Sequence, residues 1–290
     1  MEIHQKQMNL KRRNYRLRKT FFRILNYLFM ALVVTFMVGP VLWIVITSLQ
    51  PMSNLMTAPP RITWRSLTGL YYQQLFADPN FVKSLKNTAL ITVISTVIVL
   101  AISCLGAYAV ARFHFSHKEL FLFFILGLQL GPAVAYLIPL FIMVRWFGLI
   151  DTHAGVILVF VTFVVPLGIW LLRGFFEDIP SELEPAARID GCSRFEAFYR
   201  IVLPLARGGI MATAIFVFIS IWGDFLIPLV LTFSRATTLT VFASAFGGLY
   251  NVNYGGAAAT AVISGLPTII LAIVFRRYLV RGLLEGSVKK

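Results

Sequence analysis

The sequence predicts an all-α polytopic membrane protein. Of its 290 residues, 58% are hydrophobic and only 13% are charged, and the mean hydropathy is +0.81. A soluble domain carries about 25% charged residues, so this composition excludes a globule built around one buried core. The apolar residues gather in six long runs that are nearly free of charge, as transmembrane helices require.

The amino-terminal segment, residues 1–23, is polar and contains eight basic residues. A cleaved signal peptide would continue with a short apolar core and a small-residue cleavage site. Instead, residues 24–49 run for 26 positions without a charge, which is long enough to cross a bilayer and to remain as an anchor. We therefore predict a basic cytoplasmic segment at 1–23 and a first span at about 24–49.

Five further apolar runs complete a predicted six-span domain at 24–275, with spans at about 87–111, 120–144, 154–172, 208–231 and 257–275. In the first long loop, residues 67–76 hold aromatic side chains that suit the lipid headgroup level, so we expect a short interfacial helix there. Pro132 and Pro139 interrupt the third span. Irregular backbone at membrane depth requires surrounding protein or a wet cavity, so this span is expected inside the bundle.

Lysine and arginine are unevenly distributed between the two sides of these spans. With the amino terminus inside, 20 of the 26 basic residues fall in inner segments and 6 in outer loops. Cytoplasmic loops of membrane proteins carry this excess, so both termini, including the tail at 276–290, are expected in the cytoplasm. The net charge of +14 also suits nucleic-acid binding, but the loop bias accounts for it, and no nucleic-acid partner is expected.

The longest polar segment after the amino terminus is the inner loop at 173–207, between the fourth and fifth spans. It carries two helix-start signals. Ser181 with Glu184 three residues later matches a capping box, and Ser193 with Glu196 matches a second. The loop is therefore expected to contain two short helices.

We place these two helices at about 182–189 and 194–203, joined by a bend at Asp190 and Gly191. Gly191 is expected in a backbone conformation that disfavours a Cβ atom. Apolar residues recur along both helices at helical spacing and predict a stripe that docks on another protein. They are Leu183, Ala187, Phe195, Phe198, Val202 and Leu205.

This loop resembles the permease subunits of bacterial binding-protein-dependent ABC importers. Those subunits share the pattern EAA, three residues, Gly, nine residues, Ile, one residue and Leu-Pro. The residues that match it here are Ala186, Ala187, Gly191, Ile201, Leu203 and Pro204. The departure is Pro185, which stands where the family usually has the Glu of EAA. Proline is tolerated in a first helical turn, and the neighbouring acid Glu184 remains.

The resemblance covers nearly the whole chain after residue 20 and is strongest to the carbohydrate branch of the family. Ile138 to Phe141 and the run from Pro228 to Leu231 carry it within the spans. The tail from Arg277 to Lys289 is similar to the end of the maltose-importer permease that lacks a large periplasmic insertion. Gly223 departs from the family, in which Asn is usual.

This resemblance implies a complex in the bacterial inner membrane. Its members would be a second permease, two ATPase subunits, an extracytoplasmic solute-binding protein and a sugar or oligosaccharide substrate. Contacts that couple the chain to the ATPase are implied for Glu184, Ala186, Ala187, Asp190, Gly191, Ile201, Leu203 and Pro204. Tail contacts to the ATPase are implied for Gly282, Leu283 and Gly286.

The chain itself has no ATP-binding motif of the form Gly-x-x-x-x-Gly-Lys-Ser/Thr. It is therefore expected to be a transport subunit and not an enzyme, without a cofactor of its own, and ATP with Mg²⁺ would bind the partner ATPase. Its four histidines lack acidic or cysteine companions at metal-ligand spacing, so no metal site is expected.

Three features bear on the solute. Asp224 is the only acid inside an apolar span, which makes a role in the pathway a hypothesis; the alternative is a boundary residue bonded to its neighbours. Trp222 suits either a sugar face or the membrane interface. In the outer loop at 232–256, Tyr250 and Asn251 lie between Gly pairs that are expected to make the loop mobile. That loop either helps to release solute or simply connects two spans.

Other functions remain open at this point. The solute of an ABC importer need not be a sugar. A secondary transporter would have several intramembrane ionisable groups and repeat symmetry, whereas this chain shows one such acid and no visible repeat. A membrane-embedded enzyme would have paired polar groups at membrane depth. Co-purification with an ATPase discriminates the importer from both.

Overall fold

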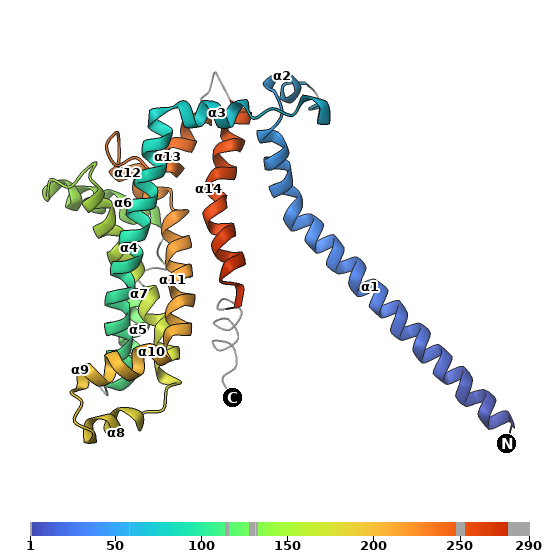
Figure 1. Ribbon diagram of the computed structural model, residues 1–290, viewed down its shortest axis with the longest axis horizontal. Coiled ribbons are helices and arrows are strands. Elements are labelled where there is room, and N and C mark those ends of the chain that lie inside the picture. Colours follow the sequence, from blue (N-terminus) through green and yellow to red (C-terminus); the bar gives the residue numbers. More distant parts are fainter. Residues whose placement is uncertain are drawn as a thin grey trace.

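The computed structural model describes residues 2–57, 59–113, 116–127, 131, 133–247 and 253–277. Throughout these ranges the regular elements are helices and there is no strand (Figure 1). The all-α membrane fold that the sequence predicts is confirmed.

Four continuous helices are long and apolar enough to cross a membrane. They are α1 (Glu2–Ser48), of which Lys19–Ser48 is the apolar part, α4 (Pro79–Arg112), α7 (His153–Glu177) and α14 (Tyr254–Val274). These helices coincide with the first, second, fourth and sixth predicted spans.

The other two predicted spans are broken. The third is divided between α5 (Lys118–Gly127) and α6 (Ala133–Trp146). The fifth is divided between α11 (Arg207–Trp222) and α12 (Leu226–Leu231). In the described part of the chain, the number of spans is four, or five when α11 and the bent segment before it are taken together. The count of six stays a prediction.

Helix α4 begins at Pro79, eight residues before the predicted start of the second span. The backbone N–H of Asn80 donates to the Asp78 carboxylate at 2.8 Å, and Pro79 occupies the first turn, where its missing N–H is harmless. The apolar run therefore begins only after Lys83 and Lys86, whereas the helix begins before them, at the start signal formed by Asp78 and Pro79.

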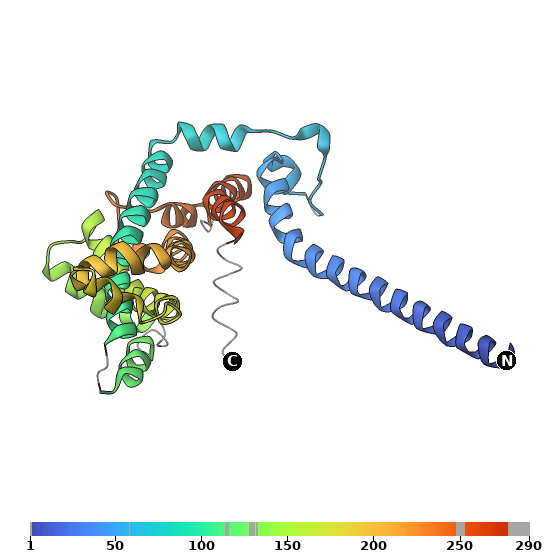
Figure 2. The ribbon, with the colours of Figure 1, turned by 60° about the horizontal axis from the view of Figure 1, so that its bottom comes forward.

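Short helices close one end of the bundle. They are α2 (Met52–Leu55), the 3₁₀ turn η1 (Trp64–Ser66), α3 (Leu70–Ala77), α13 (Leu239–Ser244) and η3 (Ala245–Gly247). Helix α3, expected at 67–76, lies across the direction of the spans (Figures 1 and 2) and buries Tyr71 and Leu75.

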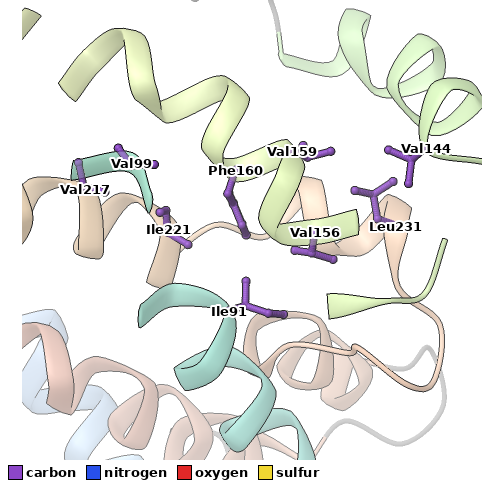
Figure 3. Packing of buried hydrophobic residues seen from close by; sticks show 9 residues of the cluster. All are labelled: Ile91, Val99, Val144, Val156, Val159, Phe160, Val217, Ile221 and Leu231. Carbon is purple, nitrogen blue, oxygen red and sulfur yellow. The ribbon is translucent and has the colours of Figure 1, made fainter. Parts of the chain in front are cut away.

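The core lies where α4, α6, α7, α11 and α12 meet (Figure 3). Its buried residues are Ile91, Val99, Val144, Val156, Val159, Phe160, Val217, Ile221 and Leu231. Close helix approach supports it: a Cβ built on Gly168 of α7 would lie 2.3 Å from the Ser103 hydroxyl of α4. Small residues at such contacts are typical of helices that pack in lipid.

A polar network ties the loop before α7 to the loop after α12. The carboxylate of Asp151 accepts hydrogen bonds from the backbone N–H groups of residues 233–236 and from the Ser234 hydroxyl. Asn87 of α4 joins this network, because its amide donates to the Arg235 carbonyl at 2.9 Å and its oxygen lies 2.8 Å from His153 Nε2. The loops at this end are thereby fixed to α4 and α7.

Helix α1 stands apart from this bundle. The most apolar part of Lys19–Ser48 has no buried residue, and only the end that leads into α2 lies near α14 (Figures 1 and 2). The start of α1 lies at the end of the molecule opposite to α3, the same end as the 173–207 loop.

Candidate functional site

The 173–207 loop folds into the helix pair that the sequence predicts. Helix α8 (Leu183–Ile189) is followed by α9 (Arg194–Ala197), which continues through a π-helical turn, η2 (Phe198–Val202), into α10 (Leu203–Leu205). The segment from α9 to α10 then bends by 75° into α11. We call α8, α9, η2 and α10 the helix pair.

The start of α9 follows the predicted capping box. The backbone N–H of Glu196 donates to the Ser193 hydroxyl at 3.2 Å, and the Ser193 N–H donates to the Glu196 carboxylate at 2.8 Å. This backbone hydrogen bond from Ser193 lowers the pKa of Glu196. The second start signal in the sequence is confirmed.

The capping box predicted for α8 is wrong. Glu182 occupies the N-cap position without a side-chain cap, and Glu184 turns inward. The Glu184 carboxylate instead accepts hydrogen bonds from Arg112 Nε at 2.5 Å and from the Tyr108 hydroxyl at 2.6 Å. The bond from Arg112 joins two ionised groups and is therefore charge-assisted. Both partners are more than 70 residues away in sequence, so no local pattern reveals them.

Pro185 does not prevent α8 from forming. It is the third residue of the helix, where the backbone N–H has no intrahelical acceptor. Where the family pattern has the glutamate of EAA, this chain therefore has the exposed, uncharged ring of Pro185.

The bend between α8 and α9 is a glycine-dependent C-cap. Gly191 has φ of +94°, as expected from the sequence. Its N–H donates to the Arg188 carbonyl at 3.1 Å, and the Cys192 N–H donates to the Ala187 carbonyl at 3.0 Å. This pair of bonds is the Schellman motif. A Cβ on Gly191 would meet nothing within 4 Å, so the requirement for glycine comes from the backbone alone.

The predicted apolar stripe is divided between two faces. Phe198 and Val202 are buried against α4 and α7, so the docking role expected for these two residues is wrong. Ala187 is also buried, and its coupling role stays a prediction. The local sequence pattern gives the spacing of the apolar residues, but it does not show which of them face the bundle and which face outward. The face left for a partner, the exposed apolar face, consists of Ile189 (86% exposed), Phe195 (69%), Tyr199 (64%), Leu205 (56%) and Leu183 (37%).

The remaining residues predicted for coupling lie on this same segment. Ala186, Asp190 and Pro204 are exposed, and Ile201 and Leu203 are partly buried. A hollow of about 360 Å³ lies between the helix pair and the end of α4. Tyr108 and Arg112 line it, and neither was identified from the sequence; the only signal was an arginine at the cytoplasmic end of a span.

Asp224 lies in the break between α11 and α12. Its carboxylate accepts a hydrogen bond from the Ile227 N–H at 3.0 Å, so it binds a backbone donor in the first turn of the short helix α12. It also lines a half-enclosed pocket of about 240 Å³. Other lining residues are Tyr136, Phe160, Phe163 and Ser220. The pocket therefore combines aromatic faces with a hydroxyl-bearing and a carboxylate-bearing wall.

Trp222 does not line this pocket. Its side chain is buried, its indole N–H donates to the Ser264 carbonyl of α14 at 2.7 Å, and its ring stacks on Phe218 with centroids 5.6 Å apart. In this conformation the ring joins α11 to α14, and this engagement does not favour the sugar-stacking role.

The other predicted site residues, Tyr250, Asn251, Gly282, Leu283 and Gly286, lie outside the described residues. The glycines that follow Tyr250 are described in part. Gly255 and Gly256 belong to the first turn of α14, where the Gly256 N–H donates to the Asn253 side chain at 2.8 Å. Both are buried, so the expectation that these two glycines make the loop mobile is wrong.

Several known proteins resemble this chain over nearly its whole length. The trehalose transport system permease protein SugB of Mycobacterium tuberculosis is 36% identical over 94% of this chain and 98% of its own. The trehalose/maltose transport system permease protein MalG of Thermococcus litoralis is 32% identical over 93% and 97%. The diacetylchitobiose uptake system permease protein NgcG of Streptomyces coelicolor is 28% identical over 92% and 89%.

The fold is shared with a solved transporter. A chain of a bacterial ABC transporter involved in the import of the acidic polysaccharide alginate superposes with a TM-score of 0.70, at 23% identity, over 89% of this chain and 96% of that one. The family model for binding-protein-dependent transport system inner membrane components matches residues 102–285, which include the helix pair and the two broken spans, α5 with α6 and α11 with α12. This chain therefore belongs to the family of binding-protein-dependent transport system inner membrane components, the permease subunits of ABC importers.

Proposed function

We propose that this permease imports a sugar or short oligosaccharide that an extracytoplasmic solute-binding protein delivers, and that ATP hydrolysis on a partner subunit drives the import. The relatives named for trehalose, maltose and diacetylchitobiose support a sugar as the solute. A related transporter was crystallised in complex with a pentasaccharide-bound periplasmic protein, which supports delivery by such a protein.

The observation that carries the ATPase partner is the helix pair. It projects at the end of the molecule where α1 starts (Figure 1). The side chains of Ile189, Phe195 and Tyr199 on it are exposed. Exposed apolar patches rimmed by charge mark protein interfaces, and Arg188 and Arg194 are exposed beside this one. Because the chain has no ATP-binding motif of its own, the partner at this face is the ATPase.

A second permease is supported by α1. The apolar part of this helix, Lys19–Ser48, exposes aliphatic and aromatic side chains along its length. One such helix separated from its own bundle gives a second subunit a surface on which to pack, in addition to lipid. Whether that subunit is a different chain or a second copy is tested by the composition of the purified complex.

The pocket beside Asp224 is the proposed point of contact with the solute. Aromatic rings cover the apolar faces of sugars, and hydroxyl and carboxylate groups bind their hydroxyls. Phe160 and Phe163 supply the first kind of group, and Asp224 and Tyr136 supply the second. Asp224→Ala should lower uptake without lowering sugar affinity of the isolated binding protein. Uptake at the unmutated rate would remove Asp224 from the pathway.

The excess of basic residues in the inner segments supports an orientation in which the helix pair and both termini lie in the cytoplasm. The start of α1 lies at the same end of the molecule as the helix pair, in agreement with this orientation (Figure 1). The location that follows is the bacterial inner membrane.

Co-purification tests the proposal. The tagged chain, expressed together with the proposed partner ATPase and second permease, is expected to retain both partners. Ile189→Asp with Phe195→Asp should release the ATPase and keep the second permease, because charges replace the two most exposed side chains of the exposed apolar face. Trp64→Asp is the matched control, since Trp64 is 75% exposed at the opposite end of the bundle. An unmutated chain that retains no ATPase contradicts the proposed function.

A further inference from the structure

We propose that Glu184 is a positioning residue that carries movement of the helix pair into α4. Together with Tyr108, Arg112 and the Ile179 carbonyl it forms what we call the α4 joint. This inference rests on the proposed function, because it concerns how ATP-driven movement of the helix pair reaches the spans.

Both oxygens of the Glu184 carboxylate are occupied within the chain. Oε1 accepts from Arg112 Nε at 2.5 Å, and Oε2 accepts from the Tyr108 hydroxyl at 2.6 Å. The side chains of Arg112 and Glu184 are only 12% and 14% exposed. At such low exposure an ion pair is weakly screened by salt and holds one geometry.

Arg112 makes a second contact with the same loop. Its Nη2 donates to the Ile179 carbonyl at 2.9 Å, four residues upstream of the start of α8. One guanidinium therefore holds the chain on both sides of the entry into α8. A rigid, planar donor is suited to this double contact, and a lysine at this position would supply only a flexible point charge.

The second half of the helix pair is held by the same end of α4. The Tyr108 ring packs against Phe198 with centroids 4.7 Å apart, and the Arg194 guanidinium lies 5.6 Å from the centre of the Phe113 ring. Residues 108–113 thus contact α8 through Glu184 and the α9 segment through Phe198 and Arg194. Neither helix of the pair can shift without moving this end of α4 or breaking these contacts.

From this end, α4 continues into the core. The Ser103 hydroxyl donates to the Val165 carbonyl of α7 at 3.2 Å, and Gly168 lets the two helices approach closely. Displacement of the helix pair is therefore passed through the α4 joint to the pair of packed spans α4 and α7. Packed side chains and hydrogen bonds of this kind are a route by which energetic coupling travels between distant sites.

The inward position also decides what Glu184 does not do. A carboxylate with both oxygens bound and 14% of the side chain exposed does not offer a charge to another subunit. Glu184 therefore does not replace the glutamate that Pro185 displaces from the family pattern. Contacts with the ATPase fall to the exposed apolar face and to the arginines beside it.

The test is the amount of solute imported per ATP hydrolysed, measured on the complete complex in proteoliposomes. Glu184→Ala is expected to lower this ratio by at least about fivefold, the lower range of typical coupling between sites. Glu184→Gln, which keeps an acceptor oxygen but loses the charge, should lie between Glu184→Ala and the unmutated chain. Glu182→Ala is the matched control: Glu182 lies two residues away and is exposed, and its carboxylate accepts a hydrogen bond from its neighbour Ser181 and not from α4, so the ratio should not change.

A double-mutant cycle tests whether Arg112 and Glu184 act together in the α4 joint or change the ratio of solute imported to ATP hydrolysed independently. Arg112→Ala with Glu184→Ala should be no worse than the more severe single change, because each single change already breaks the pair. Additive losses overturn the proposal, as does an unchanged ratio in Glu184→Ala. The proposal is also overturned if the complex with Glu184→Ala loses the ATPase while the complex with Glu182→Ala keeps it, since Glu184 would then be a contact between subunits.

Two further outcomes are distinct. If both Glu184 variants fail to insert while Glu182→Ala inserts, Glu184 is needed for folding, and the proposed role in coupling is rejected. If the unmutated complex imports no solute with ATP, the proposed function fails, whatever the variants do.

Discussion

The ring of Tyr71 in α3 lies directly against Gly255 in the first turn of α14. A Cβ built on Gly255 would lie 2.2 Å from two carbons of this ring, and Tyr71 is only 6% exposed. The missing side chain lets α3 pack against α14. Gly255 is therefore required for packing between two helices and not for loop mobility.

Gly255→Ala is expected to destabilise the protein by about 1–3 kcal/mol, the usual effect of overpacking a close contact. The measurement is thermal unfolding of the purified chain in detergent. Gly174→Ala is the control, because Gly174 is also helical and a Cβ there meets nothing within 4 Å; alanine should be neutral or stabilising at that site. Equal melting temperatures for the two variants would contradict the contact.

Asp151 gives a prediction on stability and pH. Burial of the carboxyl opposes ionisation, but the backbone N–H donors of residues 233–236 outweigh it and hold the pKa of Asp151 well below its usual range. Asp151→Asn keeps the shape and removes the charge that these donors bind. We expect a loss on the order of 1–2 kcal/mol at neutral pH, since hydrogen bonds to a charged group are worth more than neutral ones and solvent screens part of this one.

The sign of the pH dependence follows from the lowered pKa. The contribution of the ionised Asp151 is fully present above the pKa of an unfolded aspartate, about 3.9, and is lost as the pH falls below it toward the lower folded pKa. The stability difference between the unmutated chain and Asp151→Asn should therefore be constant near neutral pH and shrink below about pH 4. A difference that grows on acidification would show that the carboxylate is not the group these donors stabilise.

Gly191 predicts a graded series of coupling defects. Its φ of +94° is strained for any residue with a Cβ, although asparagine tolerates this region better than alanine or valine. Solute uptake should fall in the order Gly, Asn, Ala and Val, while membrane insertion stays intact. Gly208→Ala is the control, since Gly208 does not have a positive φ and a Cβ there would meet nothing within 4 Å. Uptake in Gly191→Val equal to that of the unmutated chain would show that the bend has no role.

The outer loop gives a prediction on solute release. Tyr250→Ala with Asn251→Ala should lower uptake while the complex still assembles and hydrolyses ATP, because an aromatic ring and an amide suit contact with sugar. Sugar affinity of the isolated binding protein, measured by calorimetry, should not change. Unchanged uptake, or a variant that fails to insert, would assign the loop a purely structural role.

The carboxy-terminal tail gives a prediction on assembly. Truncation after Arg281 removes Gly282, Leu283 and Gly286, which the family resemblance places at the ATPase. Co-purification of the ATPase should weaken, or hydrolysis should lose its dependence on solute. Normal assembly with normal coupling after this truncation would exclude a tail contact.

The features that the sequence predicted well are those set by neighbouring residues. Apolar runs located the long helices, Ser193 and Glu196 located the start of α9, and Asp190 with Gly191 located the bend. The start of α8 was predicted correctly, but its capping box was not, because Glu184 binds Arg112 of α4 and not the backbone of its own helix.

Other features depend on which helix lies opposite, which local periodicity does not report. The apolar stripe of the helix pair was correctly spaced, yet Phe198 and Val202 face α4 and α7 and leave Phe195 outside. Gly255 was predicted to be a loop residue. Its packing role was not visible in the local sequence, because the Tyr71 ring that leaves no room for a side chain there belongs to α3, far away in sequence.

Transport in proteoliposomes tests the central claim most directly. This chain, its partner permease, the ATPase and the solute-binding protein are reconstituted, with ATP and Mg²⁺ on the side of the helix pair. The sugar is the one that the binding protein is found to bind by calorimetry. The account predicts accumulation of labelled sugar against its gradient that requires ATP, the binding protein and this chain together. Accumulation that proceeds without ATP and follows an imposed proton or sodium gradient would contradict it.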